Sequence, residues 1–139
     1  MYKETRAVYD ALSMVDGLKV FTNEGETTSS VWLQFGLKDG KSYRIKFINT
    51  DDDNDISIRV YALVSITADQ VSKMLPVLNE LNAKYRFVKF VCDDDLDINV
   101  EYDFPVSCIT PEVSAKEMVI RFTDIIDEAY PVLMRKLWE

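Results

Sequence analysis

The chain has 139 residues, of which 47% are hydrophobic and 12% aromatic, enough apolar material for the core of one domain spanning residues 1–139. Its 16 basic and 24 acidic residues give a net charge of −8, and an acidic surface repels phosphate groups, so we expect binding neither to nucleic acid nor to anionic membranes. Histidine is absent, which removes the commonest general base and most zinc sites.

The first half of the chain predicts one helix followed by three strands. Apolar residues at helical spacing indicate a helix over about residues 3–15, which Asp16 and Gly17 end. A polar loop follows, with room for a short strand over residues 18–21 before it. Strict apolar–polar alternation then indicates antiparallel strands with one buried and one solvated face, over residues 30–37, 42–48 and 56–65.

The first turn between these strands can be predicted from the apolar pattern, because a slip of one residue moves every side chain to the wrong face. A three-residue loop over residues 38–40 pairs Phe35 with Tyr43 and keeps the apolar faces together. This loop requires a positive φ at Gly40. The same reasoning predicts a four-residue loop over residues 51–54.

A second hairpin is expected after residue 86. Residues 96–104 alternate strictly between apolar and polar, and in the stretch 87–92 the set Val88, Phe90 and Cys92 is more apolar than the set between them, as in strands with one buried face. Matching their apolar faces pairs Phe90 with Ile98 and leaves a three-residue loop over residues 93–95.

Two further helices complete the pattern. Thr67 and Gln70 form a capping box at the start of the second helix, and the third helix occupies about residues 112–137. Pro76 and Pro131 fall inside these helices and predict a kink or a break in each. The predicted fold is therefore α+β, in the order α-β-β-β-α-β-β-α, with helices on one face of an antiparallel sheet of about five strands.

Two acid-rich segments, residues 50–55 and 93–97, raise the possibility of a metal site. A calcium loop of the EF-hand type needs glycine at position six and glutamate at position twelve. Counted from Asp51 and from Asp93, those positions hold Ile56 and Ala62, and Ile98 and Phe104. We therefore interpret the aspartates as solvated turns and expect no metal and no cofactor. A divalent-cation or small-ligand site in these acidic loops is the alternative.

Catalytic chemistry finds no support in the sequence. Paired carboxylates work as acid and base when burial separates their pKa values, whereas these aspartates lie at loop tips or on solvated strand faces. The four glycines form no phosphate-binding motif. We expect a protein that is not an enzyme and has no catalytic residues.

Several apolar residues fall on the nominally polar face of the sheet, beside Arg44, Lys46 and Arg59. They are the candidate partner or dimer surface: Trp32, Tyr61, Leu63, Phe87 and Val91. A contiguous patch with aromatic and arginine members is typical of a protein interface. Cover by another element of the same chain is the alternative reading.

The N-terminal residues lack the basic start and apolar block of a signal peptide, and no apolar run reaches the roughly 18 residues that cross a membrane. We therefore expect a cytoplasmic protein. In that compartment Cys92 and Cys108, which lack CxxC spacing, are expected to be small apolar residues in or near the core.

The stretch LPVLNELNAKYRFVKFVCDDDLDINVEYDFPVS resembles the central motif of the YbjN family, described as bacterial sensory transduction regulators. The helix end with Asn79 and Asn82 and the two strands after it carry the resemblance, which extends over about residues 28–137. It implies a fold like that of type III secretion chaperones, and a bacterial, often dimeric protein with a regulatory or chaperone-like role. We therefore expect an interaction module that dimerises and binds an unidentified protein partner.

Overall fold

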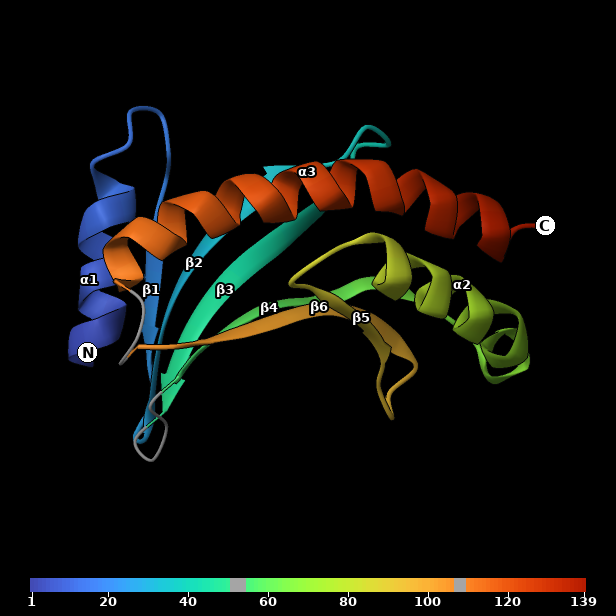
Figure 1. The fold of residues 1–139 in the computed structure, drawn as a ribbon, viewed down its shortest axis with the longest axis horizontal. Helices are drawn as coiled ribbons and strands as arrows, with labels where there is room; N and C mark the ends of the chain where they lie inside the picture. Colours follow the sequence, from blue (N-terminus) through green and yellow to red (C-terminus); the bar gives the residue numbers. More distant parts are fainter. Residues whose placement is uncertain (51–54, 107–109) are drawn as a thin grey trace.

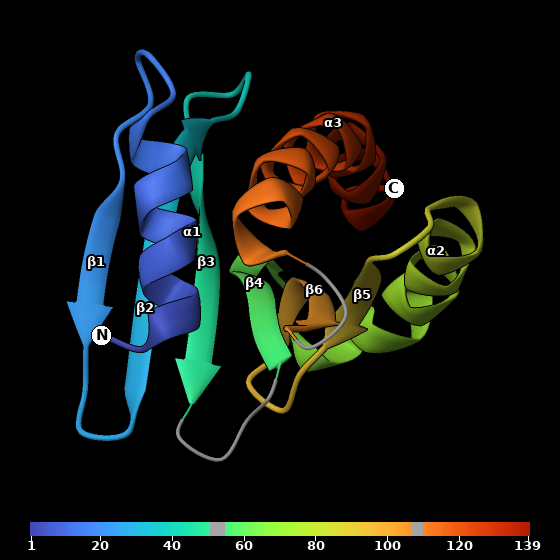
Figure 2. The ribbon, with the colours of Figure 1, turned by 60° about the vertical axis from the view of Figure 1, so that its left-hand side comes forward.

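The structure is a computed structural model that describes residues 1–50, 55–106 and 110–139. In it, helices α1 and α3 cover one face of an antiparallel sheet, and α2 lies beside α3 at one end (Figures 1 and 2). The elements in chain order are α1 (Lys3–Ser13), β1 (Phe21–Glu24), β2 (Thr28–Gly36), β3 (Ser42–Thr50), β4 (Asp55–Ser65), the 3-10 turn η1 (Ala68–Gln70), α2 (Val71–Lys84), β5 (Lys89–Cys92), β6 (Asp97–Pro105) and α3 (Pro111–Leu137).

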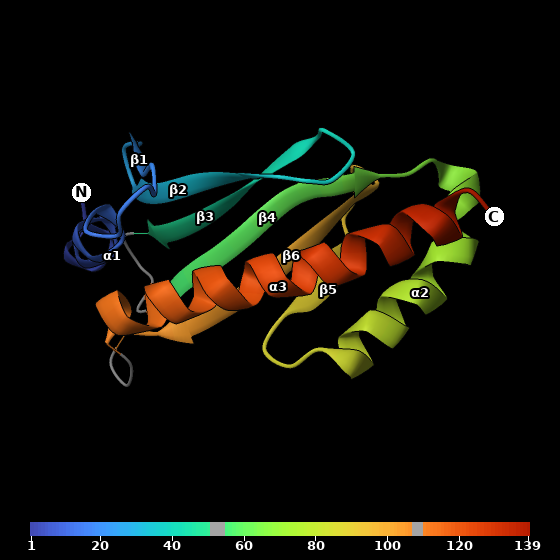
Figure 3. The ribbon, with the colours of Figure 1, turned by 90° about the horizontal axis from the view of Figure 1, so that it is seen from above.

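The sheet has six strands in the order β1-β2-β3-β4-β6-β5, so β1 and β5 are its edges (Figure 3). The predicted α+β class and the order of helices and strands are confirmed. The strand count differs because β1 forms over Phe21–Glu24 and pairs with β2, whereas the sequence pattern left room for a strand over residues 18–21. No helix in the described ranges is long and apolar enough to cross a membrane.

The hairpin between β2 and β3 has the predicted register. Phe35 lies opposite Tyr43, and Gly40 has a φ of +90°. The amide of Gly40 donates to the Leu37 carbonyl at 3.0 Å, which closes the turn over residues 38–40. The predicted loop over residues 51–54 lies outside the described residues.

The β5–β6 hairpin differs from the prediction by two residues. Phe90 lies opposite Val100, not opposite Ile98, and the three-residue loop spans residues 94–96 in place of 93–95. A shift of two residues keeps the same side chains on the same faces. Alternation of apolar residues therefore could not distinguish the two registers.

Side-chain hydrogen bonds from Asp93 explain the observed loop. Its Oδ1 accepts hydrogen bonds from the amides of Asp95 and Asp97, at 2.9 and 3.0 Å. Leu96 completes the turn in the left-handed region, with a φ of +64°. A leucine in that conformation is uncommon, so the sequence carries little sign that the turn ends there.

A β-bulge interrupts β4. Its pairing with β6 shifts between Val60 and Val64, and Ala62 there has a φ of +51°. The bulge interrupts the alternation, so that Leu63 and Val64 both face the core, and Leu63 is only 8% exposed. The prediction that Leu63 lies on the outer face is therefore wrong.

The second helical segment starts as predicted, with reciprocal hydrogen bonds between Thr67 and Gln70. Both α2 and α3 continue through Pro76 and Pro131, so of the two predicted outcomes, a kink or a break, the break does not occur. Both prolines are exposed, and the carbonyl that each leaves without an intrahelical partner can be solvated.

The core lies between the sheet and the three helices, and α2 contributes Met74, Leu78 and Leu81 to it. Its largest fully buried side chains include three phenylalanines, one from each of two strands and one from α3: Phe47, Phe104 and Phe122. α3 runs along the length of the sheet (Figures 1 and 3), and no helix formed by the described residues covers the opposite face.

Candidate functional site

A row of direct cross-strand neighbours crosses this uncovered outer face from one edge of the sheet to the other. In the order of the strands, it consists of Phe21, Trp32, Lys46, Arg59, Glu101 and Lys89. Along β2, β3 and β6 these residues alternate with core residues such as Val31, Phe47 and Val100. Six strands thus combine two aromatic rings, three cations and one carboxylate in a single line.

The aromatic end of the row is a stacked pair. The rings of Phe21 and Trp32 lie 4.3 Å apart with an angle of 17° between their planes. The guanidinium carbon of Arg44 lies 4.1 Å from the Trp32 ring centroid, on β3 beside the row. Phe21 remains 42% exposed, so this end of the row presents apolar surface to solvent.

The middle of the row borders a shallow cavity. Lys46 Nζ lies 5.6 Å from the ring centroid of Tyr61, which is 50% exposed. The cavity has a volume of about 410 Å³ and is lined by Gln34, Ser42, Tyr43, Arg44, Lys46 and Tyr61. Two cations, an amide and hydroxyl groups therefore converge on one solvent-accessible hollow.

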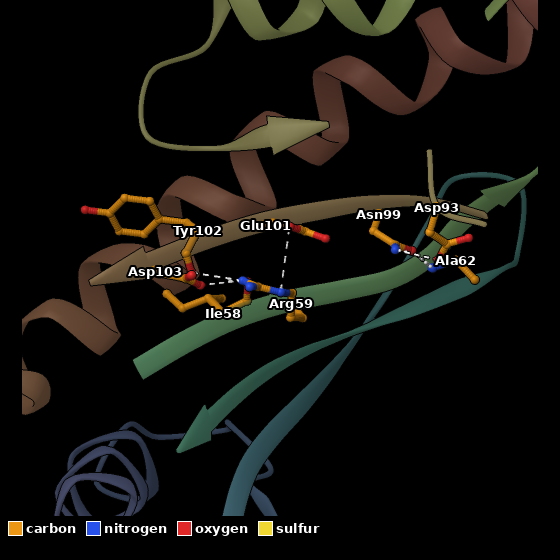
Figure 4. Close-up of polar contacts among 8 residues, drawn as sticks. All are labelled: Ile58, Arg59, Ala62, Asp93, Asn99, Glu101, Tyr102 and Asp103. Atoms are coloured by element: carbon orange, nitrogen blue, oxygen red, sulfur yellow. Dashed lines mark hydrogen bonds and ion pairs between the residues drawn. The ribbon is translucent and has the colours of Figure 1, made fainter. Parts of the chain in front are cut away.

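Arg59 in the same row is paired within the chain (Figure 4). Its Nη1 lies 2.5 Å from the Asp103 carboxylate, and its Nε lies 3.9 Å from that of Glu101. Its guanidinium also donates to the Ile58 carbonyl at 2.9 Å. Arg59 therefore has carboxylate partners, whereas Arg44 and Lys46 have none in the described residues. The contacts of Arg59 with Glu101 and Asp103 also link β4 to β6.

Figure 4 also shows a buried amide next to the β4 bulge. Asn99 is 3% exposed; its Oδ1 accepts from the Ala62 amide and its Nδ2 donates to Asp93 Oδ2, both at 2.8 Å. The hydrogen bond from Asn99, followed by that from the Asp97 amide, lowers the pKa of Asp93. The Asp93 carboxylate is thus used to build the turn.

Only part of the two acidic segments can be assessed for metal binding, because residues 51–54 are not described. In the described ranges, no group of three or more aspartate, glutamate or cysteine side chains could hold a metal ion. The aspartates over residues 51–53 lie outside those ranges, as does Cys108. Cys92 is partly buried, and desolvation, followed by the nearby Asp93, raises the pKa of its thiol.

The five residues predicted for the partner or dimer surface do not all lie on the same face of the sheet. Trp32 and Val91 lie on the outer face in the strand registers, and Tyr61 is exposed there with its ring beside Lys46. Leu63 is in the core, as described above. Phe87 lies on the helix side of the sheet, with its ring 5.9 Å from that of Tyr102 and 4.8 Å from the Arg121 guanidinium.

Phe87 departs from the prediction because it precedes β5 and has a φ of +75°, so the alternation of the strand does not extend to it. Phe21 was missed for a different reason. It belongs to a four-residue edge strand in which every residue is exposed, so no burial pattern marks it. Pairing of aromatic residues between neighbouring strands would have been the only signal.

A second surface feature lies between α1 and α3, on the opposite side of the sheet. It is a groove of about 790 Å³ with exposed apolar side chains, among them Met14, Val113 and Ile120. These side chains are 81%, 64% and 61% exposed, respectively. Such a cluster of exposed apolar residues is more typical of an interaction surface than of solvated protein.

These features define a chaperone-like α+β protein: an antiparallel sheet with helices on one face and an open, aromatic and charged opposite face. The family model TY-Chap1, described as "T3SS (YopN, CesT) and YbjN peptide-binding chaperone 1", matches residues 37–137, and the chain belongs to this family. The predicted YbjN and secretion-chaperone relationship is thereby confirmed. Comparison with curated proteins and with solved structures gave no match.

Membership in this family makes the chain a peptide-binding, chaperone-like interaction module. The match begins at residue 37 and so covers β3 to α3, including Arg44, Lys46 and Tyr61. Phe21 and Trp32 precede the matched region. The outer-face row therefore combines residues from both parts of the chain.

Proposed function

We propose that this protein is a non-enzymatic module that binds a segment of a partner protein on the outer face of its sheet. The observation that carries the proposal is the cross-strand row, with its stacked Phe21 and Trp32 at one end and the cavity beside Tyr61 near its middle. Exposed aromatic rings next to cations are typical of interfaces, because the rings supply apolar area at little cost in conformational entropy. Val91 is the third predicted residue that we retain for this surface.

We further propose a regulatory or chaperone-like role in the cytoplasm, of which the family match supports the chaperone-like part. Cation binding by the acidic loops is not the function that we propose. The Asp93 carboxylate already accepts hydrogen bonds from Asn99 and from backbone amides of its own turn. Calorimetric titration with Ca²⁺, Mg²⁺ and Mn²⁺ at millimolar concentration tests this alternative, and measurable heat of binding would restore it.

Selection from a random peptide library displayed on phage tests the proposed surface. We expect wild-type protein to enrich a set of peptides, and Tyr61→Glu and Trp32→Glu to lose binding to them. Leu75→Glu is the matched control, because Leu75 is 48% exposed on α2 and Tyr61 is 50% exposed on the outer face. Circular dichroism checks that each variant is folded. Peptide binding that is unchanged in a folded Tyr61→Glu variant contradicts the proposed surface, and so does an equal loss of peptide binding in Leu75→Glu.

We also propose that the protein is a homodimer. The groove between α1 and α3 supports this, since Met14, Val113 and Ile120 expose apolar surface that a second copy would bury. Light scattering should give a mass of twice 16.0 kDa, and Ile120→Glu should shift it towards the monomer. A wild-type mass of 16.0 kDa at high micromolar concentration would refute the dimer and leave the peptide-binding proposal standing.

A further inference from the structure

Two cations on the outer face lie against aromatic rings and line the same cavity. Arg44 and Lys46 lie two positions apart on β3 and contact the rings of Trp32 and Tyr61. In the described part of the chain, neither has a carboxylate within ion-pair distance. Arg59, on the neighbouring strand, has two.

The contacts with the rings hold these cations in place without neutralising them. A guanidinium over an indole keeps its donors free at the edge of the stack, because the ring interacts with the flat face of the group. Only the Nε of Arg44 has a hydrogen-bond partner among the described residues, Gln34 Oε1 at 3.4 Å. The two terminal nitrogens of Arg44 are thus available for a bidentate contact.

The cavity of about 410 Å³ that both cations line is suited to an anionic group. The Gln34 side chain donates to Ser42 Oγ at 3.2 Å while it accepts from Arg44, which orients the polar wall of the cavity. The hydroxyl of Tyr61 adds a further donor. A carboxylate placed there would find a bidentate arginine, an ammonium group and hydroxyl donors within one hollow.

The charge of the whole chain sets this cavity apart from its surroundings. With a net charge of −8 the protein as a whole repels anions, whereas the lining of this cavity holds two cations and no carboxylate. We infer that the cavity between Arg44, Lys46 and Tyr61 binds a carboxylate of the partner peptide, so that the protein selects acidic segments. This inference rests on the proposed peptide-binding function and names the chemistry of its ligand.

Acidic peptides offer this carboxylate in two forms, an aspartate or glutamate side chain or a free C-terminus. In either form, the apolar stack of Phe21 and Trp32 lies next to the Arg44 guanidinium and can receive a neighbouring apolar side chain. The preferred segment therefore combines a carboxylate with an adjacent apolar or aromatic residue.

The phage selection described above also tests this inference when its sequences are compared with the unselected library. Peptides enriched by wild-type protein should contain more aspartate and glutamate than the library, and peptides enriched by the Arg44→Gln, Lys46→Gln double variant should not. Lys89→Gln is the control, because it removes a cation from the other end of the same row. Enrichment of acidic residues that persists in the double variant, or that is absent with wild type, overturns the inference.

Synthetic versions of one enriched peptide then identify the source of the carboxylate by fluorescence anisotropy. Replacing each acidic residue by its amide, or the free C-terminus by an amide, should weaken binding roughly tenfold in whichever version removes the bound group. The double variant should bind the acidic and amide versions alike. If wild-type protein selects peptides but binds the acidic and amide versions equally, the inferred carboxylate site is refuted and the proposed function stands. If wild-type protein selects no peptide at all, the proposed function is refuted as well.

Discussion

The side-chain amide of Asn82 makes two hydrogen bonds to the backbone of Phe90: its Nδ2 donates to the Phe90 carbonyl at 3.1 Å, and its Oδ1 accepts from the Phe90 amide at 2.6 Å. Since β5 is an edge strand, these backbone groups point towards α2 and would otherwise form an open edge. An open edge invites pairing with another chain, so Asn82 closes one side of the sheet. This also gives a physical reason for the asparagine at this helix end.

Replacement of this amide should destabilise the protein and expose the edge. We expect Asn82→Ala to lower the free energy of unfolding by about 1–2 kcal/mol, because two partly buried backbone groups lose their partner. Urea denaturation measures the change. Asn79→Ala is the control, since Asn79 is exposed on the same helix, and its effect should stay within about 0.5 kcal/mol. Equal losses in the two variants would contradict the role of Asn82.

The positive φ of Ala62 in the β4 bulge predicts that replacing this residue by glycine is tolerated or stabilises the protein. Ala62 has a φ of +51°, a conformation that costs an alanine about 1–2 kcal/mol and a glycine very little. The more flexible unfolded chain offsets about 0.4–1 kcal/mol of this gain. We expect Ala62→Gly to change the free energy of unfolding by between zero and about +1 kcal/mol. In the middle of α1, Ala7→Gly should instead lower it by about 1 kcal/mol.

The corrected position of Leu63 can be tested by comparing it with its neighbour on the outer face. Leu63→Ala should cost about 2–5 kcal/mol, because it removes a core side chain that is 8% exposed. Tyr61→Ala, at a position that is 50% exposed, should cost about 1 kcal/mol or less. Thermal and urea unfolding of both variants measure the difference. Similar losses of stability in the two variants would contradict the buried position of Leu63.

The link between α3 and the β2–β3 turn should make stability depend on pH. The Tyr130 hydroxyl donates to Asp39 Oδ2 at 2.6 Å. This hydrogen bond, followed by that from the Lys41 amide, lowers the pKa of Asp39, while burial and then the same bond raise the pKa of Tyr130 to about 12. A lowered carboxylate pKa stabilises the fold above the unfolded value of about 3.9, and this contribution is lost as the pH falls through the folded value.

We therefore expect Tyr130→Phe to be less stable than wild type at pH 7, with a difference that narrows as the pH falls below about 4. The unfolding midpoint in urea at pH 7, 5, 4 and 3 measures this. Tyr9→Phe is the matched control, because the Tyr9 hydroxyl has no hydrogen bond in the part of the chain that the structure describes. A difference for Tyr130→Phe that stays constant with pH would contradict the coupling to Asp39.

Much of the fold could be predicted because the relevant signals are local. The alternation around Phe35 and Tyr43, with Gly40 at the turn, allows one register, and Thr67 with Gln70 marks a helix start within four residues. The β5–β6 register could not be predicted in this way. Registers that differ by two residues bury the same side chains, and the Asp93 hydrogen bonds decide between them.

For the candidate site, the sequence by itself determined that Trp32 and Tyr61 face away from the core, since period-two alternation assigns each residue to a face. Only the tertiary structure decided that Leu63 does not, because the bulge at Ala62 interrupts that alternation and leaves both Leu63 and Val64 buried. It also decided that Phe21 stacks on Trp32. Neighbours across strands depend on hydrogen-bonded registers between distant segments, and those registers exist only once the sheet has formed.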